Sequence, residues 1–423
     1  MPDRKPHPGL KEVKKIYQNL EVEPVDLKEG RIKVINKYFF RRDLSFLKGG
    51  WRLTENGRPI KFGNLPELEI EPQGSREIAL DIEKPELEAG EEYHLLITFH
   101  LMEPRPWAEP GHLVAWDQFK MPYDVPEKEP GSTSNLPALE AEENAERVIV
   151  KGKDVKAVFD KESGALESFV YKGRELVAGP LLPNFWRAPT DNDRGNFMPM
   201  RQGVWRDAGR DRNVNRVKVK KPGPSTVKVT VDSVLSAGAS TYRTLYTVTG
   251  DGRIKVENDF RPGAGLPNLP RVGMQMKIPG RYNTMIWFGR GPHESYRDRK
   301  AGAMIGLYKG KVKELIHNYS YPQENGNRTD VRWVTFTDEN GAGVKATGMP
   351  LLNASAWPYT QENLEEATHT YELEYTDEIT VNLDYKQMGV GGDNSWGARP
   401  HPQFRLTPRP YSYSFVLEPT GID

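Results

Sequence analysis

Residues 227–260 read VKVTVDSVLSAGASTYRTLYTVTGDGRIKVENDF, and this stretch decides the fold class. Three runs within it, Val227–Val231, Tyr242–Val248 and Ile254–Phe260, alternate β-branched or aromatic residues with polar ones. Such alternation is typical of strands that bury one face. Asp251-Gly252 separates the second and third runs and favours a tight hairpin turn. The stretch therefore predicts an antiparallel sheet.

The same pattern continues on both sides of this stretch, from about residue 144 to the end of the sequence. Helical periodicity is clear there only at Gln361–His369, so the whole segment predicts a large antiparallel sandwich. Further strands are expected at Val148–Val150, Val155–Phe159, Met274–Ile278, Met285–Phe288, Val331–Phe336, Ile379–Tyr385 and Tyr411–Leu417.

A second set of short strands precedes residue 125. The runs are Arg31–Phe40, Trp51–Leu53, Glu77–Ile82 and Tyr93–Leu101, with an Asn56-Gly57 hairpin signal among them. This spacing predicts an immunoglobulin-like β-sandwich over residues 19–125. Residues 126–143 are rich in Pro, Glu and Ser without a period, and we expect them to form an interdomain linker.

The stretch Gly9–Leu20 has the period of a short amphipathic helix. Its apolar residues fall near one face. They are Leu10, Val13, Ile16, Tyr17 and Leu20. So short a helix is marginal alone and needs a surface to pack against. It could be the last helix of another domain, or it could dock on the β domain that follows it.

Composition limits the classes of partner. Lys plus Arg and Asp plus Glu both total 59, so neither nucleic acid nor an anionic membrane is an expected partner. The sequence contains no cysteine, which excludes disulfides and thiolate chemistry. It also has no signal-peptide pattern and no apolar run of membrane-spanning length, so a soluble, cytoplasmic protein is expected.

The common catalytic and metal-binding signatures are missing, but four segments are unusually dense in polar and aromatic residues. One, residues 184–195, offers Arg187, Asp191 and Asp193 to hydrogen-bond sugar hydroxyls, or it is a turn capped by carboxylates. Another, residues 287–298, contains His293 and Glu294, which suit acid–base chemistry or a Gly-Pro turn held by Arg–carboxylate pairs.

The remaining two segments follow later in the chain. Residues 317–328 include Glu324, which we expect to pair with Arg328, and this favours a folding role. Residues 388–397 contain four glycines, Asp393, Asn394 and Trp396, and this is the best local sugar-binding signal because sugars stack on aromatic rings. The alternative is that Trp396 merely fills a core.

Across these segments the chain resembles the C-terminal half of the large bacterial β-galactosidases of glycoside hydrolase family 2. The motifs that carry the resemblance are Arg187-Ala188-Pro189-x-Asp191-Asn192-Asp193, Gly291-Pro292-x-Glu294-x-Tyr296 and Gly391-Gly392-Asp393-x-Ser395-Trp396. The resemblance identifies residues 1–18 with the end of the family's TIM barrel and 19–125 with its immunoglobulin-like fourth domain. Residues 144–423 resemble its fifth domain, a supersandwich shared with the galactose mutarotases.

The resemblance implies where the chemistry lies. The family is a retaining one, and its catalytic Glu pair and its Mg²⁺ and Na⁺ sites belong to the barrel, so no catalytic residue and no certain cofactor is expected in this chain. Trp396 matches the family's aromatic platform for the sugar, and residues 187–193 match a segment that borders the active site. Tyr321-Pro322 matches a backbone corner that binds a cation in some members.

The chain is therefore expected to be the C-terminal part or small subunit of a β-galactosidase, inactive alone. Its expected partners are a barrel-containing large fragment and a galactoside substrate, and a homo-oligomer is compatible with the family. Two alternatives stay open. One is a stand-alone carbohydrate-binding module, and the other is a mutarotase-like enzyme that uses His293 or His317 with Glu324.

Overall fold

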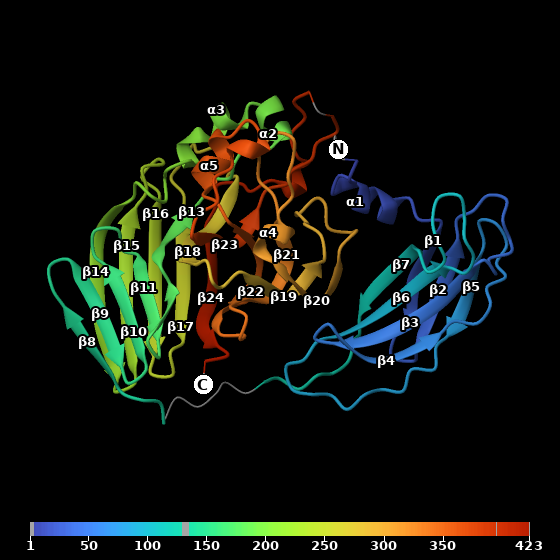
Figure 1. Ribbon diagram of the computed structural model, residues 1–423, viewed down its shortest axis with the longest axis horizontal. Coiled ribbons are helices and arrows are strands. Elements are labelled where there is room, and N and C mark those ends of the chain that lie inside the picture. Colours follow the sequence, from blue (N-terminus) through green and yellow to red (C-terminus); the bar gives the residue numbers. More distant parts are fainter. Residues whose placement is uncertain (1–3, 129–134, 395, 423) are drawn as a thin grey trace. The chain divides into compact units, whose positions relative to one another are not determined.

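A computed structural model describes residues 4–128, 135–394 and 396–422. The chain divides into two compact units. One contains His7–Gly131 and Ala301–Leu307, and the other contains Ser132–Lys300 and Tyr308–Asp423 with the first six residues. Both units are built from strands in Figure 1, and the predicted all-β fold class is confirmed. None of the helices in the described ranges is long and apolar enough to cross a membrane.

The smaller unit has two antiparallel sheets, of strand order β1-β2-β5 and β4-β3-β6-β7. Their inward residues form a single hydrophobic core that includes Leu53, Leu95 and Phe99, as expected for a sandwich. The strands are β1 Leu20–Asp26, β2 Arg31–Asn36, β3 Leu47–Glu55, β4 Arg58–Asn64, β5 Ser75–Ala79, β6 Tyr93–Leu101 and β7 Leu113–Lys120.

The β3–β4 hairpin shows how the sequence fixes this unit locally. Asn56 and Gly57 both have positive φ, 46° and 77°, as a two-residue hairpin turn requires. The turn sets the register between β3 and β4, and β3 pairs on its other side with β6, so that Trp51 lies opposite Ile97.

Helix α1 spans Gly9–Ile16, which is shorter than the predicted Gly9–Leu20. Leu20 instead begins β1 and is fully buried. The helix is held by polar contacts: Lys15 Nζ pairs with Asp117 Oδ1 at 2.5 Å, and Gln18 Nε2 donates to Asp117 Oδ2. Its apolar side chains do not dock on the β domain, since Leu10 and Ile16 remain 53% and 59% exposed.

Strands β8 to β24 form an antiparallel ladder that closes on itself, with extra pairings such as β17–β24 and β18–β23. They belong to the larger unit, apart from the first residues of β20, up to Leu307. This is the expected supersandwich. Its strands are β8 Leu139–Glu143, β9 Arg147–Gly152, β10 Val155–Asp160, β11 Leu166–Tyr171, β12 Arg174–Val177, β13 Gly179–Asn184, β14 Asn213–Gly223, β15 Thr226–Val234, β16 Thr241–Thr249, β17 Ile254–Arg261, β18 Arg271–Pro279, β19 Thr284–Gly291, β20 Met304–Lys311, β21 Arg328–Thr337, β22 Gly343–Trp357, β23 Glu378–Gln387 and β24 Tyr411–Thr420.

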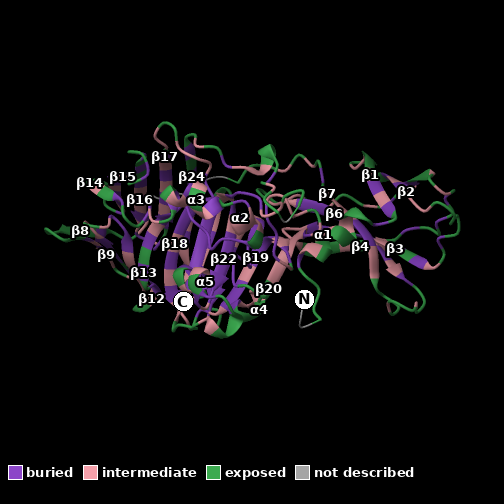
Figure 2. Cartoon of the chain, turned by 90° about the horizontal axis from the view of Figure 1, so that it is seen from above, coloured by how far each residue is buried: buried purple, intermediate pink, exposed green. Residues whose placement is uncertain are grey.

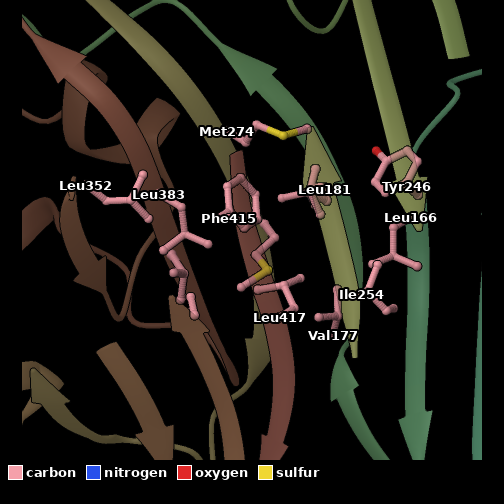
Figure 3. Packing of buried hydrophobic residues seen from close by; sticks show 14 of the residues in the cluster. Leu166, Val177, Leu181, Tyr246, Ile254, Met274, Leu352, Leu383, Phe415 and Leu417 are labelled. Atoms are coloured by element: carbon pink, nitrogen blue, oxygen red, sulfur yellow. The ribbon is translucent and has the colours of Figure 1, made fainter. Parts of the chain in front are cut away.

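Alternating burial along these strands builds one large core. Every second residue of β15 is buried, as the Val227–Val231 pattern predicts. Figure 3 shows Leu181, Met274 and Phe415 among the apolar side chains that meet between the strands. The buried positions run through the strands of this unit in Figure 2, and they extend into the loops at residues 185–190 and 322–327.

Short helices connect strands at one end of this unit, where α2, α3 and α5 are drawn close together in Figure 1. They are α2 Asp191–Gly195, α3 Met198–Gln202 and α5 Gln361–Glu366. The unit also contains α4 Val312–Leu315 and the 3₁₀ turns Gly203–Trp205, Thr370–Glu372 and Pro402–Phe404. One boundary differs from the sequence prediction. Strand β8, Leu139–Glu143, pairs with β9 and occupies the last part of the range assigned to the linker, 126–143. Part of that range, 129–134, lies outside the described residues.

Candidate functional site

The four polar segments found in the sequence meet in space within the larger unit. Asp191 N donates to Gln323 Oε1 at 3.0 Å, which joins the first segment to the third. Arg187 donates to the Met388 carbonyl, which joins the first to the fourth. Asp298 accepts from the backbone of Val390 and so joins the second to the fourth. The sandwich topology thus brings together residues that are 92 to 201 positions apart in the sequence.

A buried ion pair organises the first segment. Arg187 is fully buried, and its Nε and Nη2 donate to Asp193 Oδ2 and Oδ1, both at 2.9 Å. Asp193 also completes a capping box with Thr190 at the start of α2. Two further donations, from Nη1 to Met388 O and from Nη2 to Gly389 O, fix the glycine-rich segment. This geometry is bidentate and fully desolvated, so it is strongly directional.

The sequence predicted that Arg187 and Asp193 would bind sugar hydroxyls. They do not face a sugar, because they bond each other inside the protein. Both are positioning residues for the 388–391 loop. Asp191, in contrast, has a side chain that is 72% exposed and accepts from Gln323 Nε2 at 3.0 Å. It remains a candidate for a hydroxyl contact.

A second set of contacts braces the same loop from the other side. Asp298 Oδ1 accepts from Val390 N at 3.0 Å, and its Oδ2 accepts from Gly391 N at 2.7 Å. Asn192 Nδ2 donates to Val390 O at 2.8 Å. The backbone of Gly389 and Gly391 comes so close to Asp298 that a Cβ at Gly389 would lie 2.5 Å from its Oδ2. Glycine is therefore favoured at positions 389 and 391, because a side chain there would crowd the Asp298 carboxylate.

Beyond this braced stretch, Trp396 is 87% exposed. The alternative that it fills a core is excluded, because its ring is in solvent. Asn394 Oδ1 accepts from the Trp396 and Ala398 amides, and Asp393 Oδ1 lies 2.7 Å from His401 Nε2. Ser395, part of the same motif, lies outside the described residues.

Phe197 lies on the same hollow as Trp396 and was not expected from the sequence. The hollow has a volume of about 370 Å³ and is lined by residues 195–197 together with Asn394 and residues 396–399. Phe197 is 64% exposed and adopts a left-handed conformation, φ 59° and ψ 31°. The exposed ring and the left-handed backbone make Phe197 a candidate functional residue.

Glu294 is buried and fully bonded. Its Oε1 accepts from Arg299 Nη2 and from the Tyr319 hydroxyl, and its Oε2 accepts from Gly326 N at 2.8 Å. The alternative of a turn held by an Arg–carboxylate pair is what the structure shows. His293, at intermediate exposure, is adjacent in the chain.

Glu324 belongs to a buried network that the sequence did not reveal. Its partner is Arg271, at 2.7 Å from Nη2 to Oε2, and not the expected Arg328, which donates to the Gly326 carbonyl. Arg271 Nε also lies 3.2 Å from Asp384 Oδ2. Burial raises the pKa of Glu324 and raises the pKa of Asp384 to about 7, because one arginine serves two desolvated carboxyl groups.

Tyr321 and Pro322 do not fit a cation-binding corner. The Tyr321 carbonyl accepts from Gln323 Nε2 at 2.9 Å, and the Pro322 carbonyl accepts from Arg194 Nη2 at 3.3 Å. The Arg194 guanidinium also lies over the Tyr321 ring, 3.8 Å from its centre. A positive side chain bonded to the Pro322 carbonyl and lying over the Tyr321 ring opposes a second cation. No cluster of three acidic, histidine or cysteine side chains suited to a metal ion occurs among the residues described.

The comparisons with known proteins agree with this architecture. Residues 151–417 match the β-galactosidase small-chain family, and residues 32–122 match domain 4 of β-galactosidase. A β-galactosidase of Priestia megaterium is 38% identical over 97% of this chain, and one of Halalkalibacterium halodurans is 34% identical over 96%. The chain spans 40% and 39% of the length of those relatives.

Among solved structures, galactose 1-epimerase from Lactobacillus acidophilus NCFM is matched with a TM-score of 0.35 and 7% identity, over 68% of this chain and 99% of that one. The family assignment depends on the sequence matches alone, and the small-chain match covers well over half of the 423 residues. The chain belongs to the β-galactosidase small-chain family.

Proposed function

We propose that this chain completes the galactoside site of a β-galactosidase whose catalytic Glu pair is supplied by a barrel-containing large chain. Retaining hydrolysis needs two carboxyl groups about 5 Å apart across the glycosidic bond. In this proposal the present chain contributes binding and orientation of the sugar, and the chain alone does not hydrolyse galactosides.

The exposed Trp396 is the observation that carries the proposal. The indole is 87% exposed, and the loop that leads to it is fixed at residues 389–391 by Arg187, Asp298 and Asn192. An exposed aromatic ring on a braced loop offers its face to the C–H groups of a sugar at reduced cost in conformational entropy. Phe197 borders the same hollow and gives it a second apolar wall.

The buried carboxylates support a contribution that is not catalytic. Glu294 is 4% exposed and Glu324 is 1% exposed, and each is bonded to an arginine. A general acid or nucleophile must reach the glycosidic bond. Neither group can do so without leaving its buried partners, which also opposes the mutarotase-like alternative that uses Glu324.

Helix α1 supplies a surface for the large chain. Leu10, Val13, Ile16 and Tyr17 are between 47% and 78% exposed on a helix whose polar residues hold it in place. Contiguous exposed apolar side chains on an amphipathic helix are typical of a protein interface. In the proposal this face is covered when the barrel partner binds.

The test is hydrolysis of a chromogenic aryl β-galactoside by the purified chain, alone and mixed with a barrel-containing large fragment. The proposal expects activity only in the mixture. A matched variant, Leu10→Glu with Ile16→Glu, should abolish complementation while leaving the circular dichroism of the chain unchanged. Activity of the chain alone would refute the proposal.

A stand-alone carbohydrate-binding module is the second candidate, and the exposed Trp396 favours it equally. The hydrolysis experiment, together with a galactose titration, separates the two. A binding module would bind galactose in the titration, and Trp396→Ala would abolish that binding. It would contribute nothing to turnover by the large fragment.

A further inference from the structure

We propose that the larger unit contains a second saccharide pocket, separate from the Trp396 hollow, which binds one neutral monosaccharide unit. The pocket lies between the end of β13, the turn after Trp205 and helix α5, and its volume is about 310 Å³. That is at the lower end of the range for small-molecule sites. It shares no lining residue with the Trp396 hollow.

The floor of the pocket is made of side-chain amides. Gln361 Oε1 accepts from Asn184 Nδ2 at 2.9 Å, from Arg271 Nη1 at 3.3 Å and from Gln275 Nε2 at 3.4 Å. Because arginine can only donate, this contact fixes which end of the Gln361 amide is oxygen. The three amides are therefore held in one arrangement before any ligand arrives.

This arrangement leaves one donor and one acceptor unused. Gln361 is 8% exposed, yet its Nε2 makes no hydrogen bond with any residue that the structure describes. The Gln275 Oε1 atom likewise has no donor within the described part of the chain, since its amide is bonded only through Nε2. Neither atom is among the buried, unpartnered side-chain atoms of the described residues, so both are open to solvent, and both residues line the pocket. A neighbouring donor and acceptor match two adjacent hydroxyl groups, which both donate and accept.

The charges on the walls select a neutral ligand. Glu365 is bonded by Arg206 at 2.6 Å and by Trp186 Nε1 at 2.8 Å, and Glu362 lies 3.3 Å from Arg210. Their pairing with arginine weakens the attraction for a cation. Both arginines of the lining are engaged by carboxylates, so neither is free to attract an anion.

The remaining wall is apolar and complements the C–H face of a pyranose. Leu182, Pro183 and Phe185 line it beside the amide floor. Amides that bind hydroxyls, next to apolar groups that contact C–H bonds, form the combination by which proteins bind uncharged sugars. Nothing in this inference depends on the galactosidase proposal, because its residues and its test are different.

The test is saturation-transfer NMR of D-galactose and D-glucose with the full chain carrying Trp396→Ala, which removes the first sugar surface. We expect saturation of the sugar protons in this background. Gln361→Glu replaces the Nε2 amide group by an oxygen and keeps the acceptor. The variant should fold because its carboxylate lies beside Arg271. It should raise the dissociation constant of the sugar about tenfold, because the donor is lost.

Glu362→Trp, at an exposed rim position, should fill the pocket and abolish the signal, whereas Glu339→Trp at an exposed turn outside it should leave the signal unchanged. The absence of saturation in the Trp396→Ala background would overturn the proposal. A signal that survives Glu362→Trp would overturn it as well.

Discussion

Replacing Arg187 by Met should destabilise the larger unit and release the loop that leads to Trp396. The substitution removes two hydrogen bonds to Asp193 and two to the carbonyls of Met388 and Gly389, all at 2.9 Å. Removing one partner of a buried ion pair leaves an uncompensated charge and costs about 3–5 kcal/mol. We therefore expect the free energy of unfolding to fall by about 4 kcal/mol.

The assay is urea unfolding followed by near-ultraviolet circular dichroism, with hydrogen exchange of the Val390 and Gly391 amides as a local probe. The matched control is Arg243→Met, because Arg243 pairs with Asp232 at 2.5 Å on the surface, where an ion pair contributes about 0–1 kcal/mol. Asp193→Asn in the Arg187→Met background should recover part of the loss, since it removes the unpaired charge and retains the cap. A loss of less than about 1 kcal/mol in Arg187→Met would refute the reasoning.

Three further changes have defined outcomes. Gly273→Ala should lower the melting temperature, at a cost of about 1–3 kcal/mol, because its Cβ would lie 2.0 Å from Asp384 Oδ1; an unchanged melting temperature would contradict this. Burial raises the pKa of Asp384 to about 7, so the folded state keeps a proton that the unfolded state loses, and stability should fall as pH rises from about 4 to about 7. Asp384→Asn should flatten the pH dependence of the free energy of unfolding measured by denaturant titration. A variant with the same pH dependence as the wild type would contradict this assignment to Asp384. Phe197→Gly should stabilise the chain by about 1 kcal/mol by relieving its left-handed backbone, yet weaken galactoside binding in the complemented enzyme; tighter binding would argue against a sugar contact.

The strands that the sequence predicts well are those with a strong apolar pattern. Tyr93–Leu101 is predicted with the bounds of β6, because its apolar run lies between two turns, and its first five residues are all buried. Strand β22, Gly343–Trp357, was not predicted, since Gly348 and Pro350 interrupt its pattern. Pairing with β21, β23 and β24 holds it in the sheet despite the weak local signal.

The site could be predicted only in part for a similar reason. The segments were recognisable because Trp396 and its glycines are locally unusual, but sequence gave no distances between them. Arg271, at the start of a strand, showed no sign of its pairing with Glu324 and Asp384, which depends on three distant elements meeting in the core. Arg328 was the nearer basic residue in sequence, and the fold directs it elsewhere.

The central claim is that Trp396 is the surface that this chain presents to the galactoside. Its most direct test is the Michaelis constant for an aryl β-galactoside in the complemented enzyme, with wild type, Trp396→Ala and the control Phe62→Ala, an 83% exposed aromatic residue of the smaller unit. Loss of an aromatic contact of about 0.5–1.5 kcal/mol predicts a Michaelis constant raised severalfold in Trp396→Ala alone, with unchanged melting temperature. Equal Michaelis constants for all three enzymes would contradict the claim.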